Sequence, residues 1–381
     1  MKKSVVVILA LMLPIFLVAR PGNKWNNWKD RQSVLNNLEK ATKEGRTYFS
    51  MFKFYNYPKT DDIERSKAKD LGHPFMYGID FYEATGDYLP KEMTEPQYHN
   101  ISVIVKDAWK NNRAIPLVSW HLHSPYAVYS EFGRRMGCRY QHLVEGYPQE
   151  HRYVINEILN NKQVDTLGIG RMGDWFDAQV REIADYINNE FIDEKGNPIP
   201  FIFRLWHEQT DSWQWWGVAQ EEKRSHVSHE DYKAFWRLTV EKFKAYCPKA
   251  QILWCYCPNR HFKTEESYLS YYPGDDIVDV LAYDDYQIGD TKEVQSVEEL
   301  REIVLKRARL VSGIATRLNK PLMIAETNCR KEELKNVYFD ILQEILTDKD
   351  VHISVVQLWS MSYYKKQTIE FVQNKNIIFN K

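Results

Sequence analysis

The residues best suited to acid–base chemistry stand together in Phe201–Gly217, which reads FIFRLWHEQTDSWQWWG. Its opening run, Phe201–Phe203, has the length and composition of a buried parallel strand. Glu208 follows closely, with four tryptophans around it in the sequence. A carboxyl group held among indole rings is costly to keep ionised, so the protonated form is favoured, which suits a general acid. Indole rings also offer flat apolar faces on which sugar rings can stack, although the same tryptophans could instead be core residues.

A second acid ends a different apolar run. Pro321–Glu326 reads PLMIAE, and Thr327 and Asn328 follow it. Two carboxyl groups at one site can divide the hydrolysis of a glycosidic bond, because one protonates the leaving oxygen while the other attacks the anomeric carbon or activates water. A helix cap or a surface acid is the alternative for Glu326, since glutamate is common near helix N-termini.

The elements that would position these acids alternate along the chain. Helical spacing of apolar residues predicts helices over Asn23–Gly45, Ile101–Trp109, Asp174–Phe191, His229–Tyr246, Val297–Leu318 and Glu332–Leu346. Eight short apolar runs are predicted as strands: Thr47–Phe54, Pro74–Asp80, Ala114–His121, Phe201–Phe203, Gln251–Asn259, Ile277–Tyr286, Pro321–Glu326 and Ile353–Ser360. This alternation predicts an α/β protein, a (β/α)8 TIM barrel formed by a single domain over residues 20–381. A doubly wound sheet would also alternate, but it usually has a Gly-rich turn after its first strand, and none is present here.

Residues that could do chemistry stand where the predicted strands end. The active site of a (β/α)8 barrel lies at the C-terminal ends of its strands, so these residues should converge on one face. The long irregular segment Leu122–Gly173 is of a length that could close one end of a cleft there, and such segments often contain small helices. The strand-end residues are Asp80, His121, Glu208, Asn259, Asp284, Tyr286, Glu326 and Trp359.

Composition excludes some classes of partner and indicates another. The 381 residues carry a formal net charge of -1, which gives no reason to expect a nucleic-acid partner. The 12 Trp and 24 Tyr suit a polyol, because both side chains combine an apolar face with a hydrogen-bonding tip. The 5 Cys are odd in number and are spaced neither as a metal site nor as a dense disulfide framework, so we expect packing roles for them.

The N-terminus has the features of a targeting segment. Lys2 and Lys3 precede the apolar run Val5–Ala19, which is short for a membrane span and typical of a secretory signal. We therefore expect residues 1–19 to be a signal peptide, the mature protein to be secreted or periplasmic, and no stable membrane association after cleavage. An uncleaved membrane anchor is the alternative.

Several motifs together resemble those of glycoside hydrolase family 26, whose best-known members are endo-β-1,4-mannanases. In chain order they are PFMYGID, VSWH, FRLWHEQTDSWQWWG, WCYCPN, YYPGDDIVDVLAYDDY and IAETN, and they span residues 75–328. The resemblance implies a retaining hydrolase that cleaves β-1,4-mannosidic linkages in mannan, glucomannan or galactomannan by double displacement. The implied partner is a β-mannan-type polysaccharide or oligosaccharide, no cofactor is expected, and we expect a monomer.

The resemblance also implies roles for individual residues. Glu208 would be the general acid/base, and Glu326 would be the nucleophile. Tyr286 would donate a hydrogen bond to the nucleophile and favour its ionised form. The other substrate-binding residues that it implies are His121, His207, Trp213, Asp284 and Trp359.

Several of these assignments carry alternatives: His207 could be a structural histidine, Trp213 could pack within its loop, and Tyr286 could be an ordinary strand tyrosine. Asp284 has the same strand parity as Tyr286 and should face the same way, but it could instead pair with Arg204. The chain also departs from the family pattern after Trp359, where some family mannanases carry an arginine and this sequence has Ser360. The departure concerns a distal sugar contact and leaves the two carboxyl groups untouched.

Other functions remain open at this stage. The same two acids would serve a mixed-linkage β-glucanase or a β-xylanase. A glycan-binding barrel without activity is a different class, against which the presence of both carboxylates and Tyr286 counts. The pair His121 and His123 would permit a metal-dependent amidohydrolase, but the sequence offers no matching third and fourth ligand, and we expect no metal.

Overall fold

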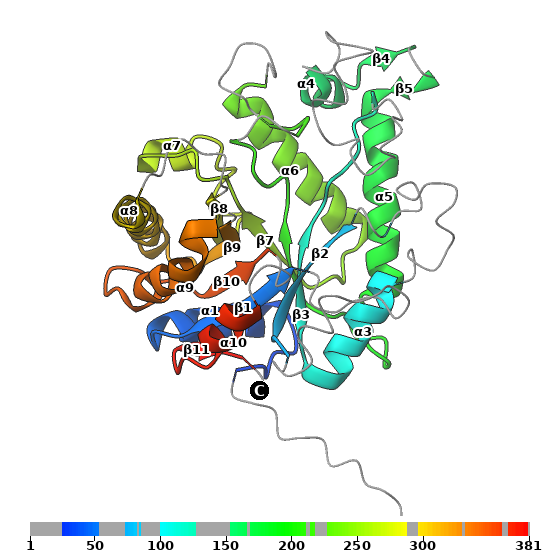
Figure 1. Ribbon diagram of the computed structural model, residues 1–381. Helices are drawn as coiled ribbons and strands as arrows, with labels where there is room; N and C mark the ends of the chain where they lie inside the picture. The colour runs from blue at the N-terminus through cyan, green and yellow to red at the C-terminus, as the bar shows by residue number, and fades with distance from the viewer. Residues whose placement is uncertain are drawn as a thin grey trace, which may run out of the picture.

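Eight parallel strands close into a barrel in the computed structural model (Figure 1). The structure describes residues 25–52, 73–81, 84, 100–126, 153–165, 168–210, 214–217, 227–287, 296–329, 332–359 and 365–379. The barrel order is β1-β2-β3-β6-β7-β8-β9-β10, and pairing of β10 with β1 closes it. This confirms the predicted (β/α)8 TIM barrel. The barrel strands are β1 (Thr47–Phe52), β2 (Met76–Asp80), β3 (Ile115–Ser119), β6 (Phe201–Arg204), β7 (Ile252–Tyr256), β8 (Val280–Gln287), β9 (Leu322–Cys329) and β10 (Val355–Leu358).

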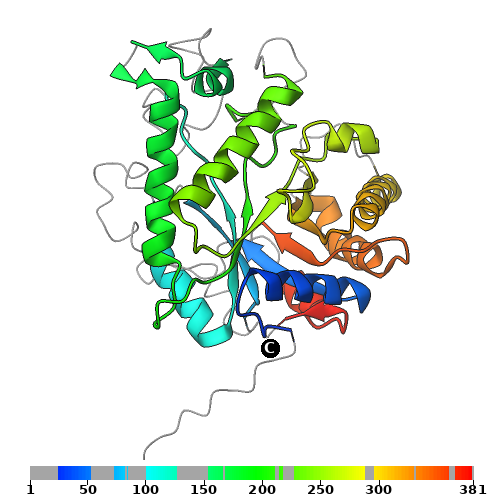
Figure 2. The same cartoon turned by 180° about the vertical axis from the view of Figure 1, so that it is seen from behind.

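Helices lie around the outside of the barrel, as the views from the front and from behind show (Figures 1 and 2). Most of them connect one barrel strand to the next, which is the right-handed crossover that parallel strands require. The helices are α1 (Arg31–Lys43), α3 (Asn100–Asn112), α4 (Val154–Leu159), α5 (Met172–Glu190), α6 (His229–Tyr246), α7 (Glu265–Leu269), α8 (Val297–Arg317), α9 (Glu332–Thr347) and α10 (Lys365–Val372).

Helix α6 shows how the sequence defines these elements. The Ser228 side chain caps its N-terminus by accepting from the Asp231 N–H, and two acids in the first turn complement the helix dipole. Phe235, Trp236 and Phe243 recur at helical spacing and are buried against the barrel. The cap thus sets where the helix begins, and the apolar stripe sets which face packs on the strands.

Helix α1 closes the N-terminal end of the barrel. Arg31 bonds the Ile252 carbonyl at the start of β7, and Thr42 bonds Ser354 just before β10, so the helix crosses from one side of the barrel to the other. The prediction placed its beginning at Asn23. The structure begins the helix later, because the Asp30 side chain forms a capping box with Ser33.

Some elements were not predicted. The segment expected to be irregular contains α4 and a two-stranded antiparallel hairpin, and the short helices α7 and α10 were missed. A further short strand pairs with β1 at the end of the described chain. The missed strands are β4 (Gln163–Val164), β5 (Gly170–Arg171) and β11 (Ile377–Ile378).

The predicted signal peptide, residues 1–19, lies outside the described residues. None of the helices in the part of the chain that the structure describes is both long enough and apolar enough to cross a membrane.

Candidate active site

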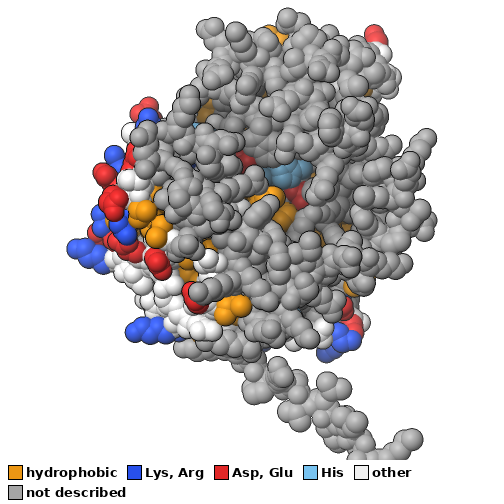
Figure 3. All heavy atoms as spheres, in the orientation of Figure 1, with side chains coloured by type: hydrophobic (Ala, Val, Ile, Leu, Met, Phe, Trp, Pro, Cys, Tyr) orange, Lys and Arg blue, Asp and Glu red, His pale blue; other side chains and the backbone are white. Residues whose placement is uncertain are grey.

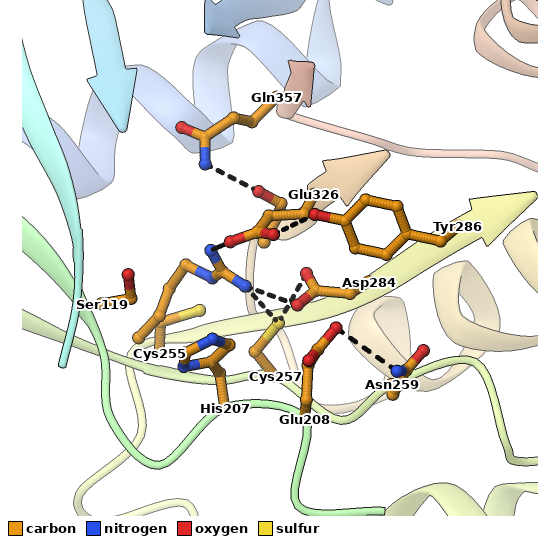
Figure 4. A network of polar contacts seen from close by, with 12 residues as sticks. Ser119, His207, Glu208, Cys255, Cys257, Asn259, Asp284, Tyr286, Glu326 and Gln357 are labelled. Atoms are coloured by element: carbon orange, nitrogen blue, oxygen red, sulfur yellow. Dashed lines mark hydrogen bonds and ion pairs between the residues drawn. The ribbon is translucent and has the colours of Figure 1, made fainter. Parts of the chain in front are cut away.

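Arg204 lies at the centre of the polar groups inside the barrel. The rings of Phe201 and Phe203 point outward from β6 and pack on other aromatic rings, whereas Arg204 points inward and has an exposed fraction of 1%. Its Nη1 donates to Glu326 Oε1 at 2.6 Å, and its Nη2 donates to Asp284 Oδ2 at 2.5 Å (Figure 4). A buried guanidinium is tolerated when it is paired in this way, so one cation holds two carboxylates in place.

Glu326 receives strong donors on both of its oxygens. Arg204 bonds Oε1, and the Tyr286 hydroxyl donates to Oε2. Burial and the neighbouring Glu326 charge raise the pKa of Tyr286 well above its usual range, so the hydroxyl remains a donor at neutral pH. Charge-assisted bonds of this kind stabilise a carboxylate and fix its orientation. The sequence-based expectation that Tyr286 bonds Glu326 therefore agrees with the geometry.

Glu208 lies in a strained turn directly after β6. Trp206 and Glu208 adopt φ angles of 47° and 56°, a left-handed conformation that is uncommon for residues other than glycine. The Glu208 N–H donates to the Cys257 carbonyl at 2.8 Å, which ties this turn to the end of β7. The carboxyl oxygens accept from Asn259 Nδ2 and from Gln214 Nε2, each at 3.3 Å. Neutral amides thus bond Glu208, whereas a guanidinium and a phenol bond Glu326.

Two histidines meet edge-on at the mouth of the barrel. The rings of His121 and His207 are perpendicular, with centroids 4.8 Å apart. Asp80 orients His121 by bonding Nδ1 and by accepting from its backbone N–H at 3.1 Å. His207 is fully buried, and burial together with Arg204 lowers its pKa well below the usual range, so its ring is neutral. His207 thus lies beside Glu208 and Asp284, and the ring of His121 packs against it.

The tryptophans around Glu208 are core residues where the structure describes them. Trp206, Trp215 and Trp216 are buried, and their indole N–H groups donate to Thr239 Oγ1, the Leu122 carbonyl and the His207 carbonyl. The expectation that these indoles offer their faces to sugar rings is wrong for these three, and the alternative of core packing holds. Trp213 lies outside the described residues.

Asp284 pairs with Arg204, as the alternative reading of the sequence allowed. The Cys257 thiol donates to its other oxygen at 3.2 Å. Burial raises the pKa of Asp284, and the Arg204 guanidinium opposes that rise. Trp359 is half-buried, and its ring lies edge-on to Tyr286 with centroids 6.4 Å apart. Asp284 is thus engaged within the protein, while Trp359 is only partly buried.

One group of side chains has the spacing of metal ligands. Ligand atoms of His207, Glu208 and Asp284 lie within 4.8 Å of one another. Both oxygens of Asp284 already accept from Arg204 or Cys257, and a guanidinium beside a bound cation would repel it. The donor set therefore fits a cation poorly, and the arrangement is better suited to organic acid–base chemistry.

Histidine, acidic and hydrophobic side chains gather at the centre of the face in Figure 3. Sequence reasoning missed Gln214, Cys257 and Gln357, which also belong to the network. The position of Cys257, at the end of a strand and with the same parity as Cys255, was the available signal for the thiol.

Comparison with known proteins shows which family and which relatives the chain resembles. The model of glycosyl hydrolase family 26 matches residues 24–369. A mannan endo-1,4-beta-mannosidase of Bifidobacterium adolescentis is 34% identical over 132 residues, which cover 34% of this chain and 12% of that protein. Another, from Bacillus subtilis strain 168, is 24% identical over 267 residues, which cover 70% of this chain and 60% of that protein. The chain thus spans less than two thirds of the length of these relatives.

A solved structure has the same fold over almost the whole chain. The structure of GH26C from Muricauda sp. superimposes with a TM-score of 0.71 at 22% identity, and the match covers 92% of this chain and 91% of that one. The match of the family model over residues 24–369 shows that the chain belongs to glycosyl hydrolase family 26.

Proposed function

We propose that this protein hydrolyses β-1,4-mannosidic linkages with retention of configuration, using Glu326 as the nucleophile and Glu208 as the general acid/base. The observation that carries the proposal is the contrast between the two carboxyl groups. Arg204 and Tyr286 bond both oxygens of Glu326, which favours a carboxylate aimed in one direction. Amides bond Glu208, and a carboxyl group in such surroundings can take up and release a proton during the reaction.

The reaction would proceed in two displacements. Glu326 attacks the anomeric carbon while Glu208 protonates the leaving oxygen, so the C1–O bond to the leaving sugar breaks as the bond to Glu326 forms. Glu208, now ionised, then removes a proton from water, and the water displaces Glu326 from the anomeric carbon. Each displacement inverts the anomeric centre, and the two together retain its configuration.

Several residues around this centre would bind the sugar. His121 and Trp359 border the carboxyl groups, and neither residue is fully buried. His207 is neutral and can exchange hydrogen bonds with a hydroxyl group. Asp284 would bind the sugar, and its bond to Arg204 would also help to orient that guanidinium. Trp213, which follows Glu208 by five positions in the sequence, completes the proposed set.

The choice of mannan rests on the relatives. Both named relatives are mannan endo-1,4-beta-mannosidases, and the network described above fits glycoside hydrolysis in general. We further propose that residues 20–381 form one catalytic domain, that residues 1–19 are a cleaved signal, and that the protein is a secreted or periplasmic monomer. Mixed-linkage β-glucan and xylan are the alternative substrates.

Parallel digestion of mannan, glucomannan, galactomannan, lichenan and xylan, with sizing of the products, tests the proposal. We expect release of manno-oligosaccharides from the three mannans. Glu326→Ala should lower turnover by at least about 1,000-fold, because it removes the covalent route. Glu208→Ala should give a burst with an activated aryl glycoside, followed by slow turnover. Degradation of lichenan or xylan alone would refute the choice of mannan, and near-normal turnover by Glu326→Ala would refute the mechanism.

A further inference from the structure

Strand β9 has one residue more than β8 in the ladder that joins them. Ile324 pairs with Tyr283, and the next pair joins Glu326 with Asp284. One step along β8 thus corresponds to two steps along β9, which makes Ala325 the extra residue of a β-bulge. Bulges of this kind re-aim side chains and are frequent beside active sites.

The ladder with β10 shows the same irregularity. Ile324 pairs with Val356, whereas Thr327 pairs with Leu358, so three steps along β9 match two steps along β10. Both neighbouring strands therefore place the extra residue between Ile324 and Thr327.

The bulge decides which way Glu326 faces. Asp284 points into the barrel toward Arg204, so its chain neighbour Tyr283 faces outward, and Ile324, which pairs with Tyr283, faces outward as well. In a regular strand, side chains two positions apart share a face, and Glu326 would then point outward with Ile324. The extra residue reverses this alternation, and Glu326 points inward to meet Arg204.

A buried glutamine from β10 bonds the extra residue. Gln357 Nε2 donates to the Ala325 carbonyl at 2.9 Å, and the glutamine is fully buried. Ser50 Oγ donates to Gln357 Oε1 at 2.8 Å and thereby orients the amide. A bulge disrupts the ladder locally, so a buried carbonyl at the extra residue needs a donor from elsewhere. Gln357 supplies that donor.

Gly78 on β2 leaves room for the glutamine. A Cβ atom at this position would lie 2.8 Å from Gln357 Oε1 and 2.5 Å from a ring carbon of Phe52, and both distances are shorter than real Cβ contacts. Residues of β1 and β2 thus contact the Oε1 end of the Gln357 amide, and the Nε2 end of the same amide bonds β9.

We propose that Gln357 is a positioning residue for Glu326: its hydrogen bond to the Ala325 carbonyl maintains the bulge that directs the Glu326 carboxylate into the barrel. This inference rests on the proposed role of Glu326 as nucleophile. Loss of the bond relaxes the bulge and displaces the carboxylate from the anomeric carbon. A displacement of about 1 Å can lower a rate about 100-fold, so we expect a loss of about 10- to 100-fold in the step in which Glu326 attacks.

The test uses 2-deoxy-2-fluoro-β-mannobiosyl fluoride, which labels a nucleophile covalently. The C1–F bond breaks as Glu326 bonds to C1, fluoride leaves, and the 2-fluoro group slows the hydrolysis that follows. Mass spectrometry of the intact protein gives both the labelling rate constant and the number of labels per protein. We expect Gln357→Leu to reach one label per protein with a rate constant at saturation about 10- to 100-fold below that of the wild type, and with an unchanged half-saturating concentration.

Matched variants separate positioning from folding. Thr47→Val removes another buried side-chain bond next to β10, from Thr47 Oγ1 to the Ile353 carbonyl at 2.9 Å, and it should label at the wild-type rate. Gln357→Glu keeps the shape of the side chain, but an ionised glutamate has no donor for the Ala325 carbonyl. Its labelling rate constant should therefore fall as far as that of Gln357→Leu. Ser50→Ala removes the bond that orients the amide, so its labelling rate constant should fall several-fold. This variant decides the question if both Gln357 variants fail to fold.

Two results would overturn the inference. One is a wild-type labelling rate in Gln357→Leu, and the other is a reduced number of labels at an unchanged rate, which would indicate a folding role. Absence of a label on Glu326 in the wild type would instead refute the proposed function itself.

Discussion

Replacement of Arg204 by methionine should destabilise the protein, and more strongly at alkaline pH. The Arg204 side chain has an exposed fraction of 1% and bonds two carboxyl groups, Asp284 and Glu326, whose side chains are 0% and 9% exposed. Methionine fills much of the same volume without charge, so both carboxyl groups lose their buried counter-ion. Removal of one partner from a buried ion pair costs about 3–5 kcal/mol in the free energy of unfolding.

The direction of the pH dependence follows from Asp284. Burial raises the pKa of Asp284 to about 8, and Arg204 opposes that rise, so the folded-state pKa should rise further in Arg204→Met. A carboxyl group whose folded-state pKa is raised binds a proton in the native state that the unfolded state has released. Its contribution to stability is therefore present at low pH and is lost as the pH rises through the window between the two pKa values.

Urea unfolding at pH 7 and pH 9.5, followed by tryptophan fluorescence, measures this effect. The deficit of Arg204→Met should be about 3–5 kcal/mol at pH 9.5 and smaller at pH 7, and above pH 8 it should grow by at most about 1.4 kcal/mol per pH unit, because only the variant then still binds a proton at Asp284 in the folded state. Arg309→Met makes the same replacement at the surface, where Arg309 pairs with Asp348, and should change stability little at either pH. The same deficit at both pH values, or none, would refute the reasoning.

Two other substitutions test the hydroxyl and indole groups of the site. Tyr286→Phe should lower kcat about 10- to 100-fold with little change in KM, because it removes a hydrogen bond to the charged Glu326; an unchanged kcat in steady-state assays would contradict this role. Trp215→Phe should lower the free energy of unfolding by about 1–3 kcal/mol, because the buried Leu122 carbonyl loses its donor, and should leave KM unchanged. A clear rise in KM would show that this indole contacts the substrate.

The barrel and its reactive face were predictable because one pattern, a short apolar run with a polar residue at its end, recurs along the chain. Each barrel strand is a short apolar run, and burial on both faces makes such runs visible without knowledge of their partners. The carboxyl ends of the strands form one face, so Asp80, His121, Glu208 and Glu326 could be grouped from sequence alone. Helix boundaries were less accurate where a cap decided them, as Asp30 does for α1.

The remaining features depend on contacts between distant residues. Whether Trp206, Trp215 and Trp216 face a sugar or the core depends on acceptors such as Thr239, which the local sequence does not reveal. The bulge at Ala325 is also invisible in PLMIAETN, because a regular strand and a bulged strand share the same apolar run. The position of Glu326 at the end of an apolar run placed it on the reactive face, and the family resemblance implied its role as nucleophile, but strand alternation from Ile324 would have turned its side chain outward.

The anomeric configuration of the first product tests the central claim most directly. Proton NMR of a mannan-derived oligosaccharide digest, recorded before mutarotation, distinguishes the two anomers at the new reducing end. Attack by Glu326 followed by attack of water, with Glu208 as acid and then base, predicts that the β anomer appears first and that the α anomer grows in later. An α anomer that appears first would contradict double displacement and the role of Glu326 as nucleophile.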